Sequence, residues 1–235
     1  MSSSWKDVWN KKIVDSQNDG LLDSLIKANG FDGGPGNYLA TDYLDMVEDM
    51  VRHLDIKENH KVLEVGCGSG ALLYSISQLS GAKIYGYDYS ASLISEARRF
   101  VNGFFKVSEA ISCPFTEMKF DFVISHSVFQ YFPDKSYARD VICSMSNLIL
   151  AGGKIAIYDL NDSEKEFEYH SLRRQSCDDP SLYDSKYKNL KHLFYDKNEI
   201  YEQLKHLGFK DLTFPPHSSL NYENARFRFN IYGTK

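Results

Sequence analysis

The stretch KVLEVGCGSGALL, from Lys61 to Leu73, constrains the fold of this 235-residue chain more than any other. It has the pattern of a buried strand that ends in glycines and then continues as a helix. Glycines at such a turn let the backbone come close to a bound ligand. Gly66, Gly68 and Gly70 therefore predict an α/β fold with a ligand site at the end of this strand.

Short apolar runs alternate with helical stretches from Val62 onward. The runs are KVLEVG, AKIYGYD, GFFKVS, FDFVIS and GGKIAIYDL. The stretches between them, GALLYSISQLS, SASLISEARRFV and DKSYARDVICSMSNLIL, carry apolar residues three and four apart, as helices do. This alternation predicts a parallel sheet with helices on both faces.

Both ends of the chain depart from this alternation. DKNEIYEQLKHLGF predicts a helix that opens with a capping box of Asp196 and Glu199. FKDLTF and RFRFNIYGTK follow as two strands joined by a loop, an arrangement that is normally antiparallel. Before the first strand, SSSWKDVWNKKIVDSQNDGLLDSLIKANG and NYLATDYLDMVEDMVRHLDI predict helices around the link GFDGGPGNY.

Composition narrows the class of protein. The hydrophobic content of 43% and charged content of 25% are those of an ordinary globular protein. A net charge of −5 gives no basic face for nucleic acid, and no apolar run is long enough to span a bilayer. The start MSSSWKDVWNKK lacks the apolar core of a signal peptide. The cysteines form no CxxC pair and have no His at metal-ligand spacing, so we expect free thiols, no metal and a cytoplasmic location. From the net charge and the lack of a long apolar run, we expect no nucleic-acid or membrane partner.

The glycine turn by itself fits two kinds of ligand, because it also aligns with the G-x-G-x-x-G/A pattern of dinucleotide sites. Glu64, two residues before the first glycine, would repel a pyrophosphate but suits the ammonium of an amino acid. Asp88 ends the next strand, where a carboxylate can accept hydrogen bonds from ribose hydroxyls of either ligand. The structural alternatives are, for Glu64, a cap on the following helix or a pairing with Lys61, and for Asp88 a helix-start role.

Four motifs together resemble the class I S-adenosylmethionine-dependent methyltransferases: VLEVGCGSG, IYGYDYS, FDFVISHSVFQYF and LAGGKIAIYDL, in the family's order and spacing. The resemblance runs from about Lys61 to the C-terminus. It implies a Rossmann-like, doubly wound, seven-stranded sheet with the last strand antiparallel and helices on both faces. It also implies S-adenosyl-L-methionine as cofactor and S-adenosyl-L-homocysteine (SAH) as product.

The expected organisation is a single methyltransferase domain over residues 1–235. It comprises an N-terminal helical cap or lid (1–58), a cofactor-binding half (59–160), a helical substrate-lid insertion after the fifth strand (161–195), and a terminal helix with the antiparallel strand pair (196–235). The cap and the insertion could equally form a dimer surface.

The resemblance assigns cofactor-binding roles to ten positions. In the family's terms the turn passes beneath the methionine half, Glu64 orients that half, Asp88 binds the ribose and Tyr89 lies against the adenine. The chain has Ser108-Glu109-Ala110 where many members have Gly-Asp-Ala, so the adenine contact is a looser match. The ten positions are Glu64, Gly66, Cys67, Gly68, Gly70, Asp88, Tyr89, Glu109, Ala110 and Ser125.

Methyl transfer from a sulfonium requires mainly that the acceptor be placed behind the methyl carbon and that water be excluded. A base is needed only when the acceptor must lose a proton, as a hydroxyl does. His126 follows the fourth strand directly, at the ligand edge of the sheet, and is the candidate catalytic residue; the alternative is a helix-start role. We expect metal-independent transfer to oxygen or nitrogen of a polar small molecule, anionic ones included.

Acceptor contacts are expected from the later elements. If the last strand is antiparallel, the loop PPHSSLNYENAR lies at the cofactor edge, and the insertion adds cations and phenols. The alternative for the insertion is a solvated helix with its charges outward. Trp5 and Trp9 either cover the mouth of the site or only pin the first helix. The substrate-binding candidates are Tyr131, Arg173, His192, His217, Asn221 and Tyr222.

Two other functions stay open. A short-chain NAD(P)-dependent oxidoreductase is favoured by Tyr187 and Lys191 at the Tyr-x-x-x-Lys spacing, and opposed by Glu64 and by a glycine strand that starts only at residue 61. A non-catalytic S-adenosylmethionine-binding protein would keep the same cofactor residues. The sequence leaves open the acceptor, oxygen versus nitrogen methylation, and the oligomeric state, a homodimer included.

Overall fold

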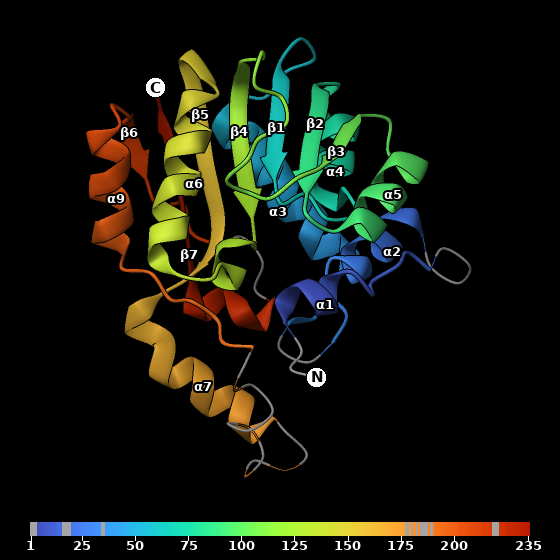
Figure 1. Cartoon of the computed structure of the whole chain (residues 1–235), viewed down its shortest axis with the longest axis vertical. Coiled ribbons are helices and arrows are strands. Elements are labelled where there is room, and N and C mark those ends of the chain that lie inside the picture. Colours follow the sequence, from blue (N-terminus) through green and yellow to red (C-terminus); the bar gives the residue numbers. More distant parts are fainter. Residues whose placement is uncertain are drawn as a thin grey trace.

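A seven-stranded sheet forms the centre of the molecule (Figure 1). The computed structural model describes residues 4–15, 20–33, 36–176, 179, 181, 183, 188, 190–217 and 221–235. Within them the strand order is β3-β2-β1-β4-β5-β7-β6. The strands are β1 (Lys61–Val65), β2 (Lys83–Asp88), β3 (Phe104–Val107), β4 (Phe120–His126), β5 (Ile149–Asn161), β6 (Lys210–Thr213) and β7 (Arg228–Thr234).

The pairing confirms the predicted topology. β1 pairs in parallel with both β2 and β4, while β2–β3 and β4–β5 are also parallel. β7 is antiparallel to both β5 and β6. The chain moves from β1 outward to β3 and then returns to β4 on the other side of β1. The sheet therefore has its switch point between β1 and β4, where open α/β sheets bind ligands.

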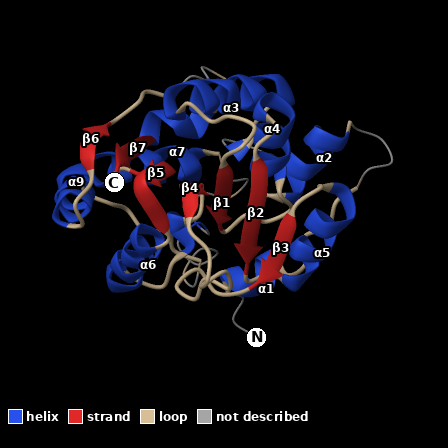
Figure 2. Cartoon of the chain, turned by 90° about the horizontal axis from the view of Figure 1, so that it is seen from above, coloured by secondary structure: helices blue, strands red, loops and turns tan. Residues whose placement is uncertain are grey.

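Helices cover both faces of the sheet (Figure 2). On one side lie α3 (Ala40–Leu54) and α4 (Ala71–Ser80), and on the other α6 (Lys135–Asn147) and α9 (Lys197–His206). Further helices are α1 (Trp5–Trp9), α2 (Leu21–Ala28), α5 (Ala91–Phe100) and α7 (Glu166–Gln175), with short 3₁₀ turns η2 (Phe129–Tyr131), η3 (Ser163–Lys165) and η5 (Glu223–Phe227). The two large apolar cores contact the sheet, and a third, small cluster consists of Tyr169, Phe194 and Phe227.

The burial of β1 explains its sequence. Val62, Leu63 and Val65 are fully buried because both faces of the central strand are covered. Glu64 is the one charged side chain among these apolar residues, and it is 2% exposed. Such a placement needs a reason beyond packing.

The predicted N-terminal helix is wrong in extent. The structure has α1 and α2 as two short helices, with residues 10–15 outside regular structure and residues 16–19 outside the described range. The predicted helix before β5 ends earlier than expected, at Asn147. Leu148 and Ile149 turn into the sheet, where the carbonyl of Leu148 accepts from the Phe120 amide.

The predicted start of α9 is partly confirmed. The Asp196 carboxylate accepts from the amides of Asn198 and Glu199, as an N-cap does. The Glu199 side chain lies 3.5 Å from Lys135 Nζ on α6. Only half of the predicted capping box is therefore present: Asp196 caps α9, whereas the Glu199 side chain links α9 to α6.

The insertion begins with η3 and α7, and α7 projects beyond the sheet at the end where β1, β2 and β4 terminate (Figure 1). The helix α1 lies at the same end. Among the described residues, no helix is both long enough and apolar enough to cross a membrane.

Candidate functional site

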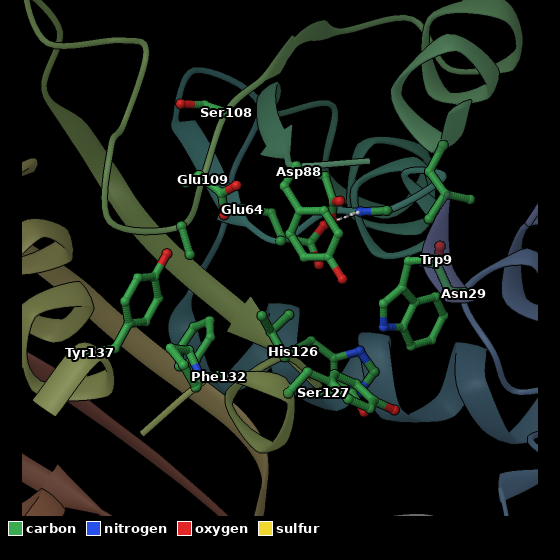
Figure 3. Close-up of a pocket in the computed structure, with 18 of the residues that line it drawn as sticks. Trp9, Asn29, Glu64, Asp88, Ser108, Glu109, His126, Ser127, Phe132 and Tyr137 are labelled. Carbon is green, nitrogen blue, oxygen red and sulfur yellow. Dashed lines mark hydrogen bonds between the residues drawn. The ribbon is translucent and has the colours of Figure 1, made fainter. Parts of the chain in front are cut away.

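A cavity opens at the carboxyl ends of β1, β2 and β4. It encloses about 980 Å³, its open mouth included. Figure 3 shows Glu64, Asp88 and Glu109 on one side of it and His126 and Ser127 on the other. The cavity thus lies at the switch point of the sheet.

The glycine turn forms the wall nearest β1. Gly66 has φ +76°, and a Cβ there would lie 2.6 Å from a γ carbon of Val128. The amides of Gly66 and Cys67 donate to the Tyr87 carbonyl at 2.8 and 3.1 Å, which ties the turn to β2. Because side chains are excluded here, the backbone itself is presented to the cavity.

Of the other predicted turn residues, Gly68 lines the cavity, whereas Cys67 and Gly70 lie outside its wall. Cys67 is fully buried, and a Cβ at Gly86 would lie 2.7 Å from its Sγ. Gly70 has φ +83° and occupies the N-cap position of α4. These two residues support the conformation of the turn without lining the cavity.

Glu64 carries a buried carboxylate whose Oε2 has no hydrogen-bond partner among the described residues. Burial raises the pKa of Glu64 well above its ordinary value, and the nearby Asp88 carboxylate adds to that rise. A buried polar atom without a partner is costly. Since Glu64 lines the cavity, a cationic ligand group such as an ammonium would complete it.

Asp88 is held by two backbone amides. Its Oδ2 accepts from Gly68 at 3.0 Å and its Oδ1 from Ser90 at 2.8 Å. Burial raises the pKa of Asp88 to about 6, although both hydrogen bonds act in the opposite direction. Each carboxylate oxygen keeps a lone pair for a ligand, so the fixed group can accept from two hydroxyls of a sugar.

Ser108, Glu109 and Ala110 line the far end of the cavity, after β3. The Glu109 carboxylate lies 2.7 Å from Lys6 Nζ, and both side chains are about half exposed. Lys6 also lies 5.6 Å from the ring centroid of Tyr89, another wall residue. The region predicted for the adenine is therefore reached by α1.

The N-terminal helices contribute two wall residues, Trp9 and Asn29. The Trp9 ring packs on Gly30, where a Cβ would lie 2.5 Å from it, and the Trp9 carbonyl accepts from Ser90 Oγ at 3.2 Å. Asn29 Oδ1 accepts from the Ser69 amide at 2.8 Å and so fastens α2 to the glycine turn. The spacing of Trp5 and Trp9 in the sequence pointed to the contact made by Trp9. No feature of the sequence pointed to Asn29.

At the end of β4 the wall is formed by His126 and Ser127. The His126 ring is 7% exposed and stacks on Phe31, with centroids 5.7 Å apart. Burial lowers the pKa of His126 to about 4, so the ring is neutral near pH 7. Ser125 is fully buried, donates from Oγ to the Val65 carbonyl, and lies outside the wall.

A set of buried polar residues adjoins this wall. Arg228 Nη1 contacts the Asp159 carboxylate and lies 3.2 Å from Ser127 Oγ. The Tyr222 hydroxyl donates to Asp159 Oδ2 at 3.1 Å, and His217 Nε2 lies 3.7 Å from Asp159 Oδ1. His217 and Tyr222 were predicted as acceptor contacts; Asp159 and Arg228 were not singled out.

The other acceptor candidates are spread out. Tyr131 lines the cavity, and its ring meets those of Trp5 and His192 at 4.7 and 5.3 Å. Arg173 and His192 line a separate open hollow beside α7. Asn221 is exposed and donates to Asp42, away from the cavity. Tyr187, of the Tyr-x-x-x-Lys spacing, lies outside the described residues.

The wall suits an S-adenosyl amino acid. The unpartnered Glu64 oxygen suits its ammonium, the fixed Asp88 carboxylate its ribose, and the positive-φ Gly66 a close approach of the backbone. In the described part of the chain, no three or more His, Cys, Asp or Glu side chains gather as a metal site would require.

Comparison with known proteins points in one direction. A family model described as a methyltransferase domain matches residues 56–210, more than half of the chain. Methyltransferase GfsG of Streptomyces halstedii is 28% identical over 122 residues, which cover 49% of this chain and 43% of that protein. Phosphoethanolamine N-methyltransferase 1 of Zea mays is 26% identical over 203 residues, which cover 77% of this chain and 39% of that protein. The chain thus spans less than half the length of these curated relatives.

A solved structure shares the fold. Magnesium protoporphyrin IX methyltransferase of Synechocystis, with bound SAH, aligns with a TM-score of 0.59 and 16% identity, over 91% of this chain and 98% of that one.

Proposed function

The chain belongs to the class I S-adenosylmethionine-dependent methyltransferases, and on that premise we propose that it methylates a polar small molecule, with an amine nitrogen preferred over an oxygen. The cofactor of the family is S-adenosyl-L-methionine, which when bound supplies a methyl carbon already activated by the sulfonium. The chain's own task is to bind, orient and exclude water.

The observation that carries the proposal is the pair of carboxylates at the glycine turn. Glu64 and Asp88 face one cavity, the first without a hydrogen-bond partner among the described residues and the second fixed by two amides. In this proposal Glu64 receives the ammonium of the cofactor and Asp88 its ribose. Gly66 and Gly68 let the backbone lie beneath the methionine half.

The acceptor binds on the opposite wall, at His126, Ser127 and Tyr131. A hydroxyl acceptor must lose its proton during transfer, whereas a neutral amine need not. Because burial lowers the pKa of His126 to about 4, its ring is a weak base at neutral pH. This favours nitrogen, and the N-methyltransferase named among the relatives agrees with it.

The test is a methyl-transfer assay that measures SAH formation with paired acceptors, each amine against the alcohol of the same skeleton. We expect turnover with an amine and none with its alcohol. In His126→Ala, kcat/KM for the acceptor should fall about tenfold or more while SAH affinity is kept.

The matched control is His206→Ala, at the exposed end of α9, which should behave as wild type. Preferential methylation of alcohols would contradict the choice of nitrogen. An equal loss of SAH affinity in His126→Ala would move His126 to the cofactor side.

A further inference from the structure

A buried polar cluster lies behind the acceptor wall. It consists of Asp159, Arg228, His217, Tyr222 and His126, and is named here the Asp159 cluster. The Asp159 side chain is fully buried, that of Arg228 is 4% exposed and that of His217 is 9% exposed. The cluster reaches the cavity through His126 itself and through the contact of Arg228 with Ser127.

The backbone around the cluster is unusual at two places. Ser127 and Asp159 are non-glycine residues with φ of +57° and +66°. Ser127 follows β4 directly and Asp159 lies near the end of the neighbouring strand β5; the Ser127 amide donates to the Tyr158 carbonyl at 3.1 Å, and Arg228 contacts both side chains. Asp159 also lies in a register shift of β5 against β7, between Ile157 and Leu160. Bulges and strained residues of this kind gather next to active sites, where they redirect a side chain.

The Asp159 carboxylate is only half used. Its Oδ2 is contacted by Arg228 and accepts from the Tyr222 hydroxyl. Its Oδ1 has no hydrogen-bond partner among the described residues, and His217 Nε2 at 3.7 Å is beyond hydrogen-bond reach. A fully buried carboxylate oxygen without a donor is costly, so a ligand that brings an N–H to it is favoured.

The charges around Asp159 Oδ1 favour a ligand that donates a hydrogen bond to this oxygen. Burial acts to raise the pKa of Asp159, but the Arg228 guanidinium and the other nearby groups together outweigh it, and the pKa lies below its ordinary value. Burial lowers the pKa of His217, so both neighbouring imidazoles are neutral at pH 7. The cluster therefore offers a negative oxygen and neutral rings to its ligand.

Aromatic rings complete the surroundings. The rings of Phe31 and Tyr43 lie 5.7 and 5.8 Å from the His126 ring, and Tyr38 stacks on Tyr222 at 4.3 Å. Aromatic faces attract cations and protonated amines. A carboxylate among aromatic rings is a suitable site for an amine.

We propose that Asp159 Oδ1 anchors the methyl acceptor, and that the acceptor is a primary or secondary amine whose N–H donates to this oxygen. The inference rests on the proposed function and names the substrate class of the same site. The amine reacts in its neutral form, so an amine that arrives as an ammonium first releases one proton to solvent. The nitrogen then bonds to the methyl carbon as the carbon–sulfur bond breaks. The sulfur keeps the electron pair, and the positive charge passes to the nitrogen.

The test uses the protein saturated with SAH and calorimetric titration with four amines: ethanolamine, phosphoethanolamine, histamine and 2-phenylethylamine. Each is compared with the compound in which a hydroxyl replaces the amino group. We expect at least one amine to bind about tenfold or more tightly than its hydroxyl counterpart, and Asp159→Asn to abolish that preference. Asn keeps the shape of Asp and tolerates the left-handed backbone.

Asp162→Asn is the matched control. Asp162 follows β5 directly and is also buried, at 4% exposure, but its carboxylate binds Lys197 Nζ at 2.7 Å and the Glu164 amide at 3.0 Å. This variant should keep the affinity for the amine. Both variants should keep the SAH affinity within about twofold, because the proposed cofactor contacts, Glu64 and Asp88, are unchanged in both.

A second measurement needs no variant, in case Asp159→Asn fails to fold. Addition of the amine to the SAH-bound wild type should shift the NMR ring signals of His217 and His126, and leave those of His60 and His206 in place. Equal binding of amine and hydroxyl compounds, unchanged binding in Asp159→Asn, or no binding of any of the four amines would overturn the inference alone. Failure of SAH to bind would overturn the proposed function and the inference together.

Discussion

At the scale of single residues, the fold buries the carboxylates of Glu64 and Asp88, and this burial disfavours their charged forms. Burial raises the pKa of both, to about 6 for Asp88 and well above the ordinary value for Glu64. Each is charged only when a proton is removed from a poorly solvated site. A ligand that brings an ammonium and two hydroxyls reverses this, because it favours the ionised forms.

The first prediction follows from that linkage. SAH needs both carboxylates ionised, and the raised pKa of Asp88, about 6, leaves this group partly protonated near pH 6 in the free protein, so binding there should release protons. The affinity should fall as the pH is lowered from about 7 to 5, by up to about tenfold per pH unit for Asp88, and the raised pKa of Glu64 acts in the same direction. Calorimetry in buffers of different ionisation enthalpy measures the protons released. Proton uptake on binding would contradict the assignment.

The sequence revealed some of the site residues and hid others for a physical reason. Glu64 and Asp88 were predicted because each belongs to a strand whose carboxyl end must meet the ligand edge of a parallel sheet. Asp159 becomes visible only through the pairing of β5 with β7, which brings Arg228 opposite Asn161. That register, and the bulge before it, depends on contacts between segments far apart in the sequence.

At the scale of elements, the glycine turn is where local chain geometry and the site depend on each other. Gly66 and Gly208 have similar backbone angles, φ +76° and +88°, but only Gly66 has a neighbour in the way, Val128 at 2.6 Å. Gly208 has nothing within 4 Å. The two positions separate backbone strain from steric conflict.

The second prediction compares alanine at these two glycines. Gly208→Ala should lower the free energy of unfolding by about 1–2 kcal/mol, the cost of a left-handed backbone. Gly66→Ala should cost more and also weaken SAH binding, because its Cβ displaces Val128 or the turn. Val128→Ala added to Gly66→Ala should recover part of the loss. Chemical denaturation measures all four proteins; equal losses at the two glycines would show that the contact with Val128 is unimportant.

The short helix α1 is the second element that completes the site. Its two tryptophans both pack on Tyr131 but differ in their other contacts: Trp9 lines the cofactor cavity, whereas the Trp5 indole donates to the Lys191 carbonyl and stacks on His192, outside that cavity. The sequence pattern allowed both a lid and an anchoring role, and the structure combines them. What periodicity could not give was the break between α1 and α2.

The third prediction uses this difference. Trp9→Ala should weaken SAH binding about tenfold or more, since it removes a large apolar wall beside Asp88. Trp5→Ala, in the same helix, should leave SAH affinity within about twofold of wild type. Calorimetry on both variants decides the matter. Equal losses would mean that α1 acts only by folding as a unit.

At the scale of the whole molecule, the order of strands places the site. The chain reverses direction across the sheet between β1 and β4, so the glycine turn and the end of β4 face each other across one cavity. Alternating strands and helices were enough to predict this sheet, because they reflect burial on two faces. The insertion was predicted as a helical substrate lid over residues 161–195; among its described residues the structure has the short turn η3 and the helix α7, and its role as a lid stays a prediction.

The proposed function requires that the cavity hold an S-adenosyl amino acid through Glu64 and Asp88. The deciding measurement is calorimetric titration of SAH into the wild type and into Asp88→Ala, with NADH as the control ligand. We predict micromolar binding of SAH, a loss of about 1.5–3 kcal/mol in Asp88→Ala, as expected for hydrogen bonds to a charged group, and no binding of NADH. Binding of NADH in place of SAH, or an SAH affinity unchanged by the loss of Asp88, would contradict it.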